Sequence, residues 1–176
     1  RIPDIGDDAL DGARPDVLII GGGISGASIA RELTRWKIDV LLVDKEADLA
    51  VQASGRNDGE VHPGVDLGKG TLKQKYVVRG NRMFDKLCDD LDVPFKRCGQ
   101  YAGFTEWFTL PVVWLYGLQR KYICGVDDTR IVFGKKIRRG EPGLNHDIKF
   151  ALNNPMAGCV CPYGLTIAFG ENAAAN

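Results

Sequence analysis

The stretch Asp16-Val-Leu-Ile-Ile-Gly-Gly-Gly-Ile-Ser-Gly26 decides the fold, because it joins a short apolar run directly to a glycine-rich turn. The run at residues 16–20 is continuous, which is typical of a strand buried on both faces. Residues 24–36 then repeat apolar positions at helical spacing, and residues 39–43 form a second apolar run. This order of strand, turn, helix and strand predicts a βαβ unit with a right-handed crossover.

The glycine turn fits the pattern G-x-G-x-x-G through Gly21, Gly23 and Gly26. We expect Gly21 to permit the tight turn, Gly23 to let the backbone approach a pyrophosphate, and Gly26 to let the helix pack close to the strand. The helix N-terminus then offers N–H groups and partial positive charge to phosphates. Asp44 ends the second strand 23 positions after Gly21, where an acid that binds a ribose hydroxyl is expected. The context therefore favours a dinucleotide site over a glycine-rich turn without a ligand.

The segment after Asp44 separates nicotinamide from flavin dinucleotides. It runs Lys45-Glu-Ala-Asp-Leu-Ala50 and then Gln52-Ala-Ser-Gly-Arg-Asn-Asp-Gly-Glu-Val-His-Pro-Gly64. This segment resembles the D-amino-acid-oxidase-type superfamily of FAD enzymes, above all FAD-dependent glycerol-3-phosphate dehydrogenases and L-2-hydroxyglutarate oxidases. The likeness extends over nearly all of residues 16–176 and implies FAD as the cofactor. An NAD(P) enzyme is the disfavoured alternative, since the loop argues against NAD and the charge of Asp44 would repel the 2′-phosphate of NADP.

The resemblance also implies which residues contact FAD. In that superfamily a Ser-, Gly- and Asn-rich stretch lies along the pyrophosphate and the flavin, and a histidine sits near the flavin ring. The implied cofactor contacts are Gly21, Gly22, Gly23, Ile24, Ser25, Gly26, Asp44, Lys45, Ser54, Gly55, Arg56, Asn57 and Asp58. His62 is the catalytic candidate, because an imidazole can hydrogen-bond the flavin or move a substrate proton near neutral pH. The bland alternatives are a solvated loop histidine and, for Arg56, a solvated charge in place of a phosphate or carboxylate contact.

The function implied by the resemblance is that of an FAD-dependent dehydrogenase or oxidase. Such an enzyme takes hydride from the hydroxyl-bearing carbon of a small anionic substrate, such as glycerol 3-phosphate or a 2-hydroxy acid. Two alternatives stay open: a non-catalytic nucleotide-binding fragment of a larger flavoprotein, and an FAD amine or amino-acid oxidase of the same superfamily. Oxygen, a quinone or another protein could serve as the electron acceptor.

The expected fold class is α/β, with a Rossmann-like FAD-binding βαβ start and an added mixed α+β region. We expect a flexible leader over residues 1–15, the FAD-binding region over 16–92, the start of a substrate or cap region over 93–150, and a return segment with a helix over 151–176. Family members are typically more than twice this long, and no capping signal ends the last helix. We therefore expect the 176 residues to be the first portion of a larger flavoprotein, incomplete relative to the full family fold.

Further elements follow from local patterns along the chain. The spacing predicts a helix over residues 73–91 with Tyr76 on its apolar face, a helix over 105–122 interrupted near Pro111, and a helix over 165–175. It also predicts two short strands, at 93–99 and 101–104, around a glycine turn. Residues 135–139 are expected to be a basic strand end on a solvated edge.

Composition narrows the class of protein further. Lys plus Arg and Asp plus Glu both number 23, so net charge gives no reason to expect nucleic acid as a partner. No run reaches the ~18 apolar residues of a membrane span, although peripheral membrane contact is left open. The five cysteines lack framework or metal-ligand spacing, so we expect ordinary thiols, no metal site and a reducing, cytoplasmic compartment.

Overall fold

The computed structural model describes residues 12–176, so most of the leader expected over 1–15 lies outside the described residues. The chain divides into two compact units, each built from separate segments. The first unit comprises the chain up to Gly59 with residues 86–94 and 160–176. The second comprises residues 60–85 and 95–159.

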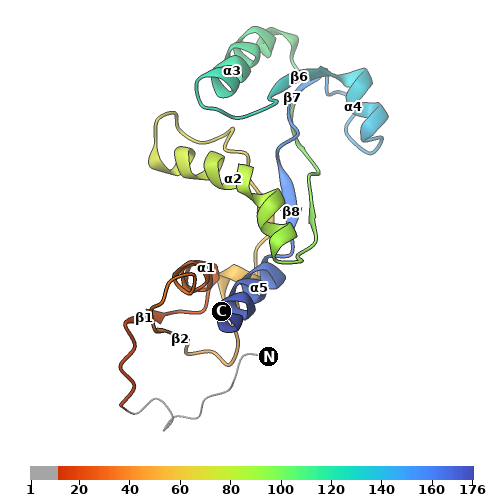
Figure 1. The fold of residues 1–176 in the computed structure, drawn as a ribbon. Coiled ribbons are helices and arrows are strands. Elements are labelled where there is room, and N and C mark those ends of the chain that lie inside the picture. The colour runs from red at the N-terminus through yellow and green to blue at the C-terminus, as the bar shows by residue number, and fades with distance from the viewer. Residues whose placement is uncertain (1–11) are drawn as a thin grey trace. The chain divides into compact units, whose positions relative to one another are not determined.

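The first unit is built on the predicted βαβ order. Strands β1 (Val17–Ile20) and β2 (Val40–Val43) pair in parallel, and helix α1 (Ile24–Leu33) connects them. Helix α5 (Pro162–Ala175) packs beside α1, as Figure 1 shows. The two helices are joined where Arg31 Nε donates to Asn172 Oδ1 over 3.0 Å. The sequence-based expectation of a parallel crossover is confirmed.

The expectation that the first strand is buried on both faces is wrong. Leu18 and Ile20 are 53% and 82% exposed, whereas Ile19 lies against Gly26 of α1. Within the described residues, α1 packs on the Ile19 side of β1, and the side that carries Leu18 and Ile20 is exposed. Helix α1 also ends at Leu33, before the expected end at residue 36.

Helix α2 (Leu72–Asp90) matches the predicted helix within one residue at each end. The expectation that Tyr76 lies on its apolar inner face is wrong, because Tyr76 is 58% exposed. The buried positions are Gln74, Val78, Asn81 and Cys88, two of which carry amides. Since these amides hydrogen-bond buried carbonyl groups, polar side chains can occupy the inner face of the helix.

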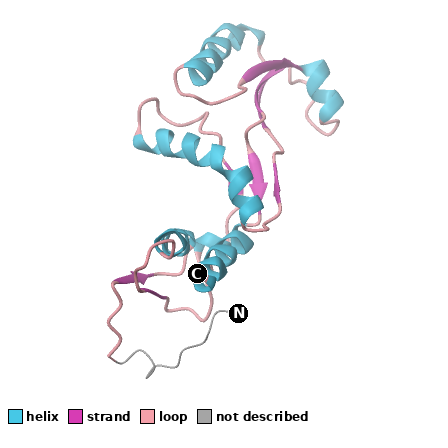
Figure 2. Cartoon of the chain, in the orientation of Figure 1, coloured by secondary structure: helices cyan, strands magenta, loops and turns pink. Residues whose placement is uncertain are grey.

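The second unit holds two three-stranded sheets, drawn in magenta in Figure 2. One has the order β3-β8-β4 and the other the order β5-β7-β6, with β7 central and antiparallel to both neighbours. All five residues of β7 are buried. The strands are β3 (Glu60–Val61), β4 (Phe95–Lys96), β5 (Gln100–Phe104), β6 (Arg130–Phe133), β7 (Phe150–Asn154) and β8 (Gly158–Val160). The strands expected around Gly99 are therefore present, and Gly99 takes a left-handed φ of +75° in the turn.

Helices α3 (Leu110–Tyr122) and α4 (Gly134–Gly140) complete the second unit. Pro111 does not interrupt α3, because it lies in the first turn, where its missing N–H removes no helical bond. The expected basic strand end at residues 135–139 is wrong, since these residues form α4. Ile137 is 1% exposed and packs with Val132, which turns one side of this short basic helix inward.

Candidate dinucleotide-binding site

The turn between β1 and α1 requires glycine at its first and last positions. Gly21 has a φ of +113°, and its N–H donates to Val43 O over 2.7 Å. A Cβ on Gly26 would lie 1.9 Å from the carbonyl oxygen of Gly21, so only hydrogen fits there. This turn lies at the carboxyl ends of the two parallel strands, where open α/β sheets bind ligands.

The N-terminus of α1 is free of acidic side chains in its first turn, so its own residues do not neutralise the partial positive charge. Gly23 caps the helix in an extended conformation, and Ser25 is exposed in the first turn. Ser54 Oγ accepts a hydrogen bond from the Ile24 N–H over 3.0 Å. A Cβ on Gly23 would come within 3.0 Å of the same oxygen. The fold thus brings Ser54, 30 positions away, against the helix end that we expect to face phosphate.

The carboxylate of Asp44 is fixed by main-chain donors. Its Oδ1 accepts from the Glu46 N–H over 2.8 Å, and its Oδ2 accepts from the Gly22 N–H. These two hydrogen bonds, Glu46 first, hold the pKa of Asp44 below its ordinary value of 3.8. Asp44 is exposed, and each carboxylate oxygen has a second lone pair, so it can still accept from a ribose hydroxyl. Lys45 is exposed and lies 3.7 Å from the Glu46 carboxylate.

Leu49 and Ala50 pack against the inner side of the glycine turn. Sequence reasoning did not predict them as part of the site. Both are buried, and the Ala50 N–H donates to Gly22 O over 3.1 Å. Leu49 fills the space that a side chain at Gly22 would need. Two apolar residues in a polar loop were the available signal, because loops seldom bury such residues without a purpose.

The loop from residue 53 to residue 59 is held by its own side chains. Asn57 Nδ2 donates to Ala53 O and Ser54 O, each over 3.0 Å, and Asn57 Oδ1 accepts from the Gly59 N–H over 2.9 Å. The side-chain amide of Asn57 thus shapes the loop. Arg56, Asn57 and Asp58 are all exposed on it.

Tyr163 is a second residue that sequence reasoning left out of the site. Its hydroxyl donates to Asp48 Oδ2 over 2.8 Å, and this hydrogen bond raises the pKa of Tyr163 above 10.0. The ring also lies beside Gly55, where a Cβ would come 3.2 Å from Tyr163 Cδ2 and 2.2 Å from Ala50 O. Helix α5 thereby packs on the loop that carries the predicted cofactor contacts.

His62, the catalytic candidate, belongs to the second unit. Its Nδ1 lies 3.4 Å from Glu60 Oε1, and half of its side chain is exposed. Asn81 Nδ2 donates to the main-chain oxygens of Val61 and His62, over 3.2 and 3.0 Å. The structure therefore gathers the glycine turn, Asp44 and Ser54 in the first unit, and fixes the backbone at His62 in the second.

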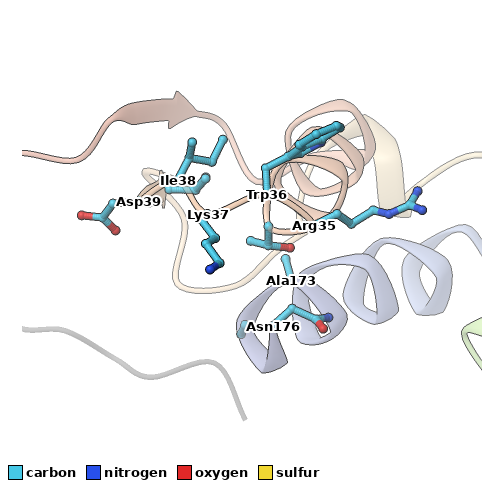
Figure 3. Close-up of a pocket in the computed structure, with 10 residues that line it drawn as sticks. Arg35, Trp36, Lys37, Ile38, Asp39, Ala173 and Asn176 are labelled. Atoms are coloured by element: carbon cyan, nitrogen blue, oxygen red, sulfur yellow. The ribbon is translucent and has the colours of Figure 1, made fainter.

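A hollow of about 690 Å³ in the first unit is distinct from the glycine turn (Figure 3). It is lined by residues 34–40 together with Ala173, Ala174 and Asn176. Residues 34–39 precede β2, so this hollow lies at the amino end of that strand. Because nucleotides bind at the carboxyl ends of parallel strands, the hollow is not the dinucleotide site.

The parallel strands, the glycine turn and the braced acid together define a dinucleotide-binding protein of the Rossmann type. Residues 16–176 match the protein family described as FAD dependent oxidoreductase. The chain belongs to that family, and FAD is the family's cofactor. The prediction of FAD in place of NAD is confirmed at the level of the protein family.

Two curated relatives resemble the chain over most of its length. It is 39% identical over 164 residues to a glycerol 3-phosphate dehydrogenase of Caloramator mitchellensis, which covers 92% of this chain and 33% of that protein. It is 33% identical over 160 residues to the mitochondrial L-2-hydroxyglutarate dehydrogenase of Nematostella vectensis, which covers 89% and 34%. The chain thus spans about a third of the length of these relatives.

Solved structures share the fold. The L-alpha-glycerophosphate oxidase of Mycoplasma pneumoniae, solved with FAD bound, gives a TM-score of 0.78 at 23% identity over 92% of this chain and 42% of that chain. A glycine oxidase from Bacillus cereus gives a TM-score of 0.76 at 27% identity over 92% and 45%. Among residues 12–176, no helix combines the length and the apolar character needed to cross a bilayer.

Proposed function

We propose that this chain forms the FAD-binding part of an enzyme that oxidises the hydroxyl-bearing carbon of a small anionic substrate. Glycerol 3-phosphate and 2-hydroxy acids are the proposed substrates, because the two curated relatives are named for such molecules. The observation that carries the proposal is the glycine turn braced by Asp44 and Ser54. Such bracing holds the turn open at the place where a pyrophosphate needs close backbone approach.

The residues present fit FAD. Glycine at positions 22 and 23 lets Leu49 and Ser54 pack directly against the turn, and the first turn of α1 offers N–H groups to the pyrophosphate. Asp44 would accept from the ribose, and the loop at residues 54–58 would lie along the cofactor. Bound FAD supplies a two-electron acceptor for the substrate's hydride. The protein's part is to bind, orient and handle the substrate proton.

We propose His62 as the group that accepts the substrate proton. Glu60 Oε1 lies beside Nδ1, so a proton on Nδ1 would face a carboxylate and Nε2 would be left as the basic nitrogen. Nε2 would then be the atom that accepts the hydroxyl proton of the substrate. The hydrogen bonds from Asn81 to the adjacent carbonyls hold the backbone that carries this imidazole.

An FAD amine or amino-acid oxidase is the second candidate. The observation in its favour is the likeness to the Bacillus cereus glycine oxidase, at 27% identity. The higher identity of 39% to a glycerol 3-phosphate dehydrogenase places the hydroxyl substrates first. A nucleotide-binding fragment without catalysis remains the third candidate.

The test uses the whole chain in two stages. Titration with FAD, monitored by the quenching of flavin fluorescence, should show saturable binding. Asp44→Ala should weaken that binding. Glycerol 3-phosphate, L-2-hydroxyglutarate and glycine are then added separately without oxygen. Either glycerol 3-phosphate or L-2-hydroxyglutarate should bleach the flavin absorption band. Bleaching by glycine alone would favour the amine oxidase, and bound FAD that no substrate bleaches would favour the fragment. Failure to bind FAD at all would refute the proposal.

A further inference from the structure

Two cysteine side chains meet in the second unit. The Sγ atoms of Cys98 and Cys159 are 3.2 Å apart, although 61 positions separate the residues. Both side chains are exposed, and none of the five cysteines forms a disulfide in this structure. Solvent therefore reaches a pair of sulfur atoms that are already in contact.

Strand pairing and hydrogen bonds hold together the segments that carry the two thiols. Cys159 lies in β8 and is paired in register with Glu60 of β3, while Cys98 follows β4 on the other edge of β8. The neighbouring Gly99 N–H donates to Ala157 O over 2.9 Å, and Arg97 donates to the carbonyl of Met156. Because both segments are bonded to each other beside the thiols, joining the sulfurs needs little movement of the backbone.

We propose that Cys98 and Cys159 form a reversible disulfide, with a hydroperoxide as the oxidant. One thiolate attacks a peroxide oxygen, the O–O bond breaks, and a sulfenic acid and one water (or alcohol) result. The second thiol attacks that sulfur, the S–O bond breaks, and a water leaves. The two thiols lose two electrons and two protons, which the peroxide takes up.

The disulfide would cross-link two adjacent segments of the β3-β8-β4 sheet. It would close a loop of about 60 residues, which restricts the unfolded chain and favours the folded sheet. Strand β3 of the same sheet leads directly into His62. Oxidation would thus stiffen the support of His62 while the glycine turn, in the other unit, keeps its own bracing. The disulfide itself does not depend on the proposed enzyme activity.

Stoichiometric hydrogen peroxide on the whole chain tests this proposal. The count of titratable thiols in the denatured chain should fall from five to three, and the mass should fall by two hydrogens. Peptide mapping should find the Cys98–Cys159 link, and dithiothreitol should reverse it. In urea, the unfolding equilibrium constant of the oxidised chain should be at least ~30-fold lower than that of the reduced chain.

Serine variants provide matched controls. Cys98→Ser and Cys159→Ser should each abolish the mass loss and the gain in resistance to urea. Cys161→Ser should retain both, because Cys161 is exposed and is no part of the pair. A link that includes Cys161, a disulfide-linked dimer, or five titratable thiols after peroxide treatment would overturn the proposal.

Discussion

Replacing Gly26 with alanine tests the central claim about the glycine turn. The new Cβ would lie 1.9 Å from the Gly21 carbonyl oxygen and 3.3 Å from Ile19 Cγ2. The first of these atoms is main chain in a turn whose N–H is bonded to β2, so it cannot step aside. The N-terminus of α1 must therefore retreat from β1 by more than about 1 Å before carbon and oxygen reach an ordinary separation of about 3.2 Å.

The cost has two parts. Overpacking of this kind costs ~1–3 kcal/mol, and the better helix propensity of alanine offsets ~0.5–1 kcal/mol of it. We expect the free energy of unfolding to fall by about 1–2 kcal/mol. A displaced helix end also loses about two charge-assisted hydrogen bonds to phosphate, each worth ~1.5 kcal/mol, so FAD affinity should fall ~100-fold.

Flavin fluorescence titration and urea unfolding measure the two effects on the same samples. Gly80→Ala is the matched control, since a Cβ at this helical position of α2 meets no atom within 4 Å. That variant should be more stable by ~0.5–1 kcal/mol and bind FAD as the parent does. A folded Gly26→Ala variant that binds FAD with unchanged affinity would refute the assignment of this turn to the pyrophosphate.

Three further outcomes are expected. Main-chain hydrogen bonds lower the pKa of Asp44 on folding. They therefore stabilise the fold well above pH 3.8, and this stability is lost as the pH falls below 3.8. In urea unfolding, Asp44→Asn should make the free energy of unfolding depend less on pH in that range. Arg97→Lys should lower the free energy of unfolding by ~2–3 kcal/mol, because an ammonium group cannot replace the planar guanidinium that donates to several carbonyls. The control Arg79→Lys, at an exposed position, should change the free energy of unfolding by less than ~0.5 kcal/mol. Ultraviolet titration should show the hydroxyl of Tyr163 ionising above its ordinary pKa of 10.0, and Asp48→Asn should reverse that shift.

The glycine turn and its acid could be predicted because their rules are local. The βαβ order follows from periodicity, and the spacing from Gly21 to Asp44 places the acid at the end of the neighbouring strand. The hydrogen bond from the Gly22 N–H to Asp44 shows that the two sequence signals meet in space. Binding of FAD by these residues stays a prediction.

The rest depends on tertiary contacts that periodicity does not report. Gln74 and Asn81 are buried on α2 because carbonyls of distant segments need donors, whereas a rule based on apolar residues places Tyr76 inside. Helix α4 buries Gly134 and Ile137, although the sequence of residues 135–139 looks fully solvated. In each case residues outside the element decide which of its sides is buried.

The interleaved make-up of the two units has a consequence for synthesis. Helix α1 belongs to the first segment of its unit, and its partner α5 belongs to the last. The ribosome must add about 130 residues between them, which takes roughly 6 to 26 seconds. During that interval the face of α1 around Ala27 and Ala30, buried in the folded chain, lacks the helix that covers it. The first unit can therefore complete its helix pair only after α5 has been synthesised.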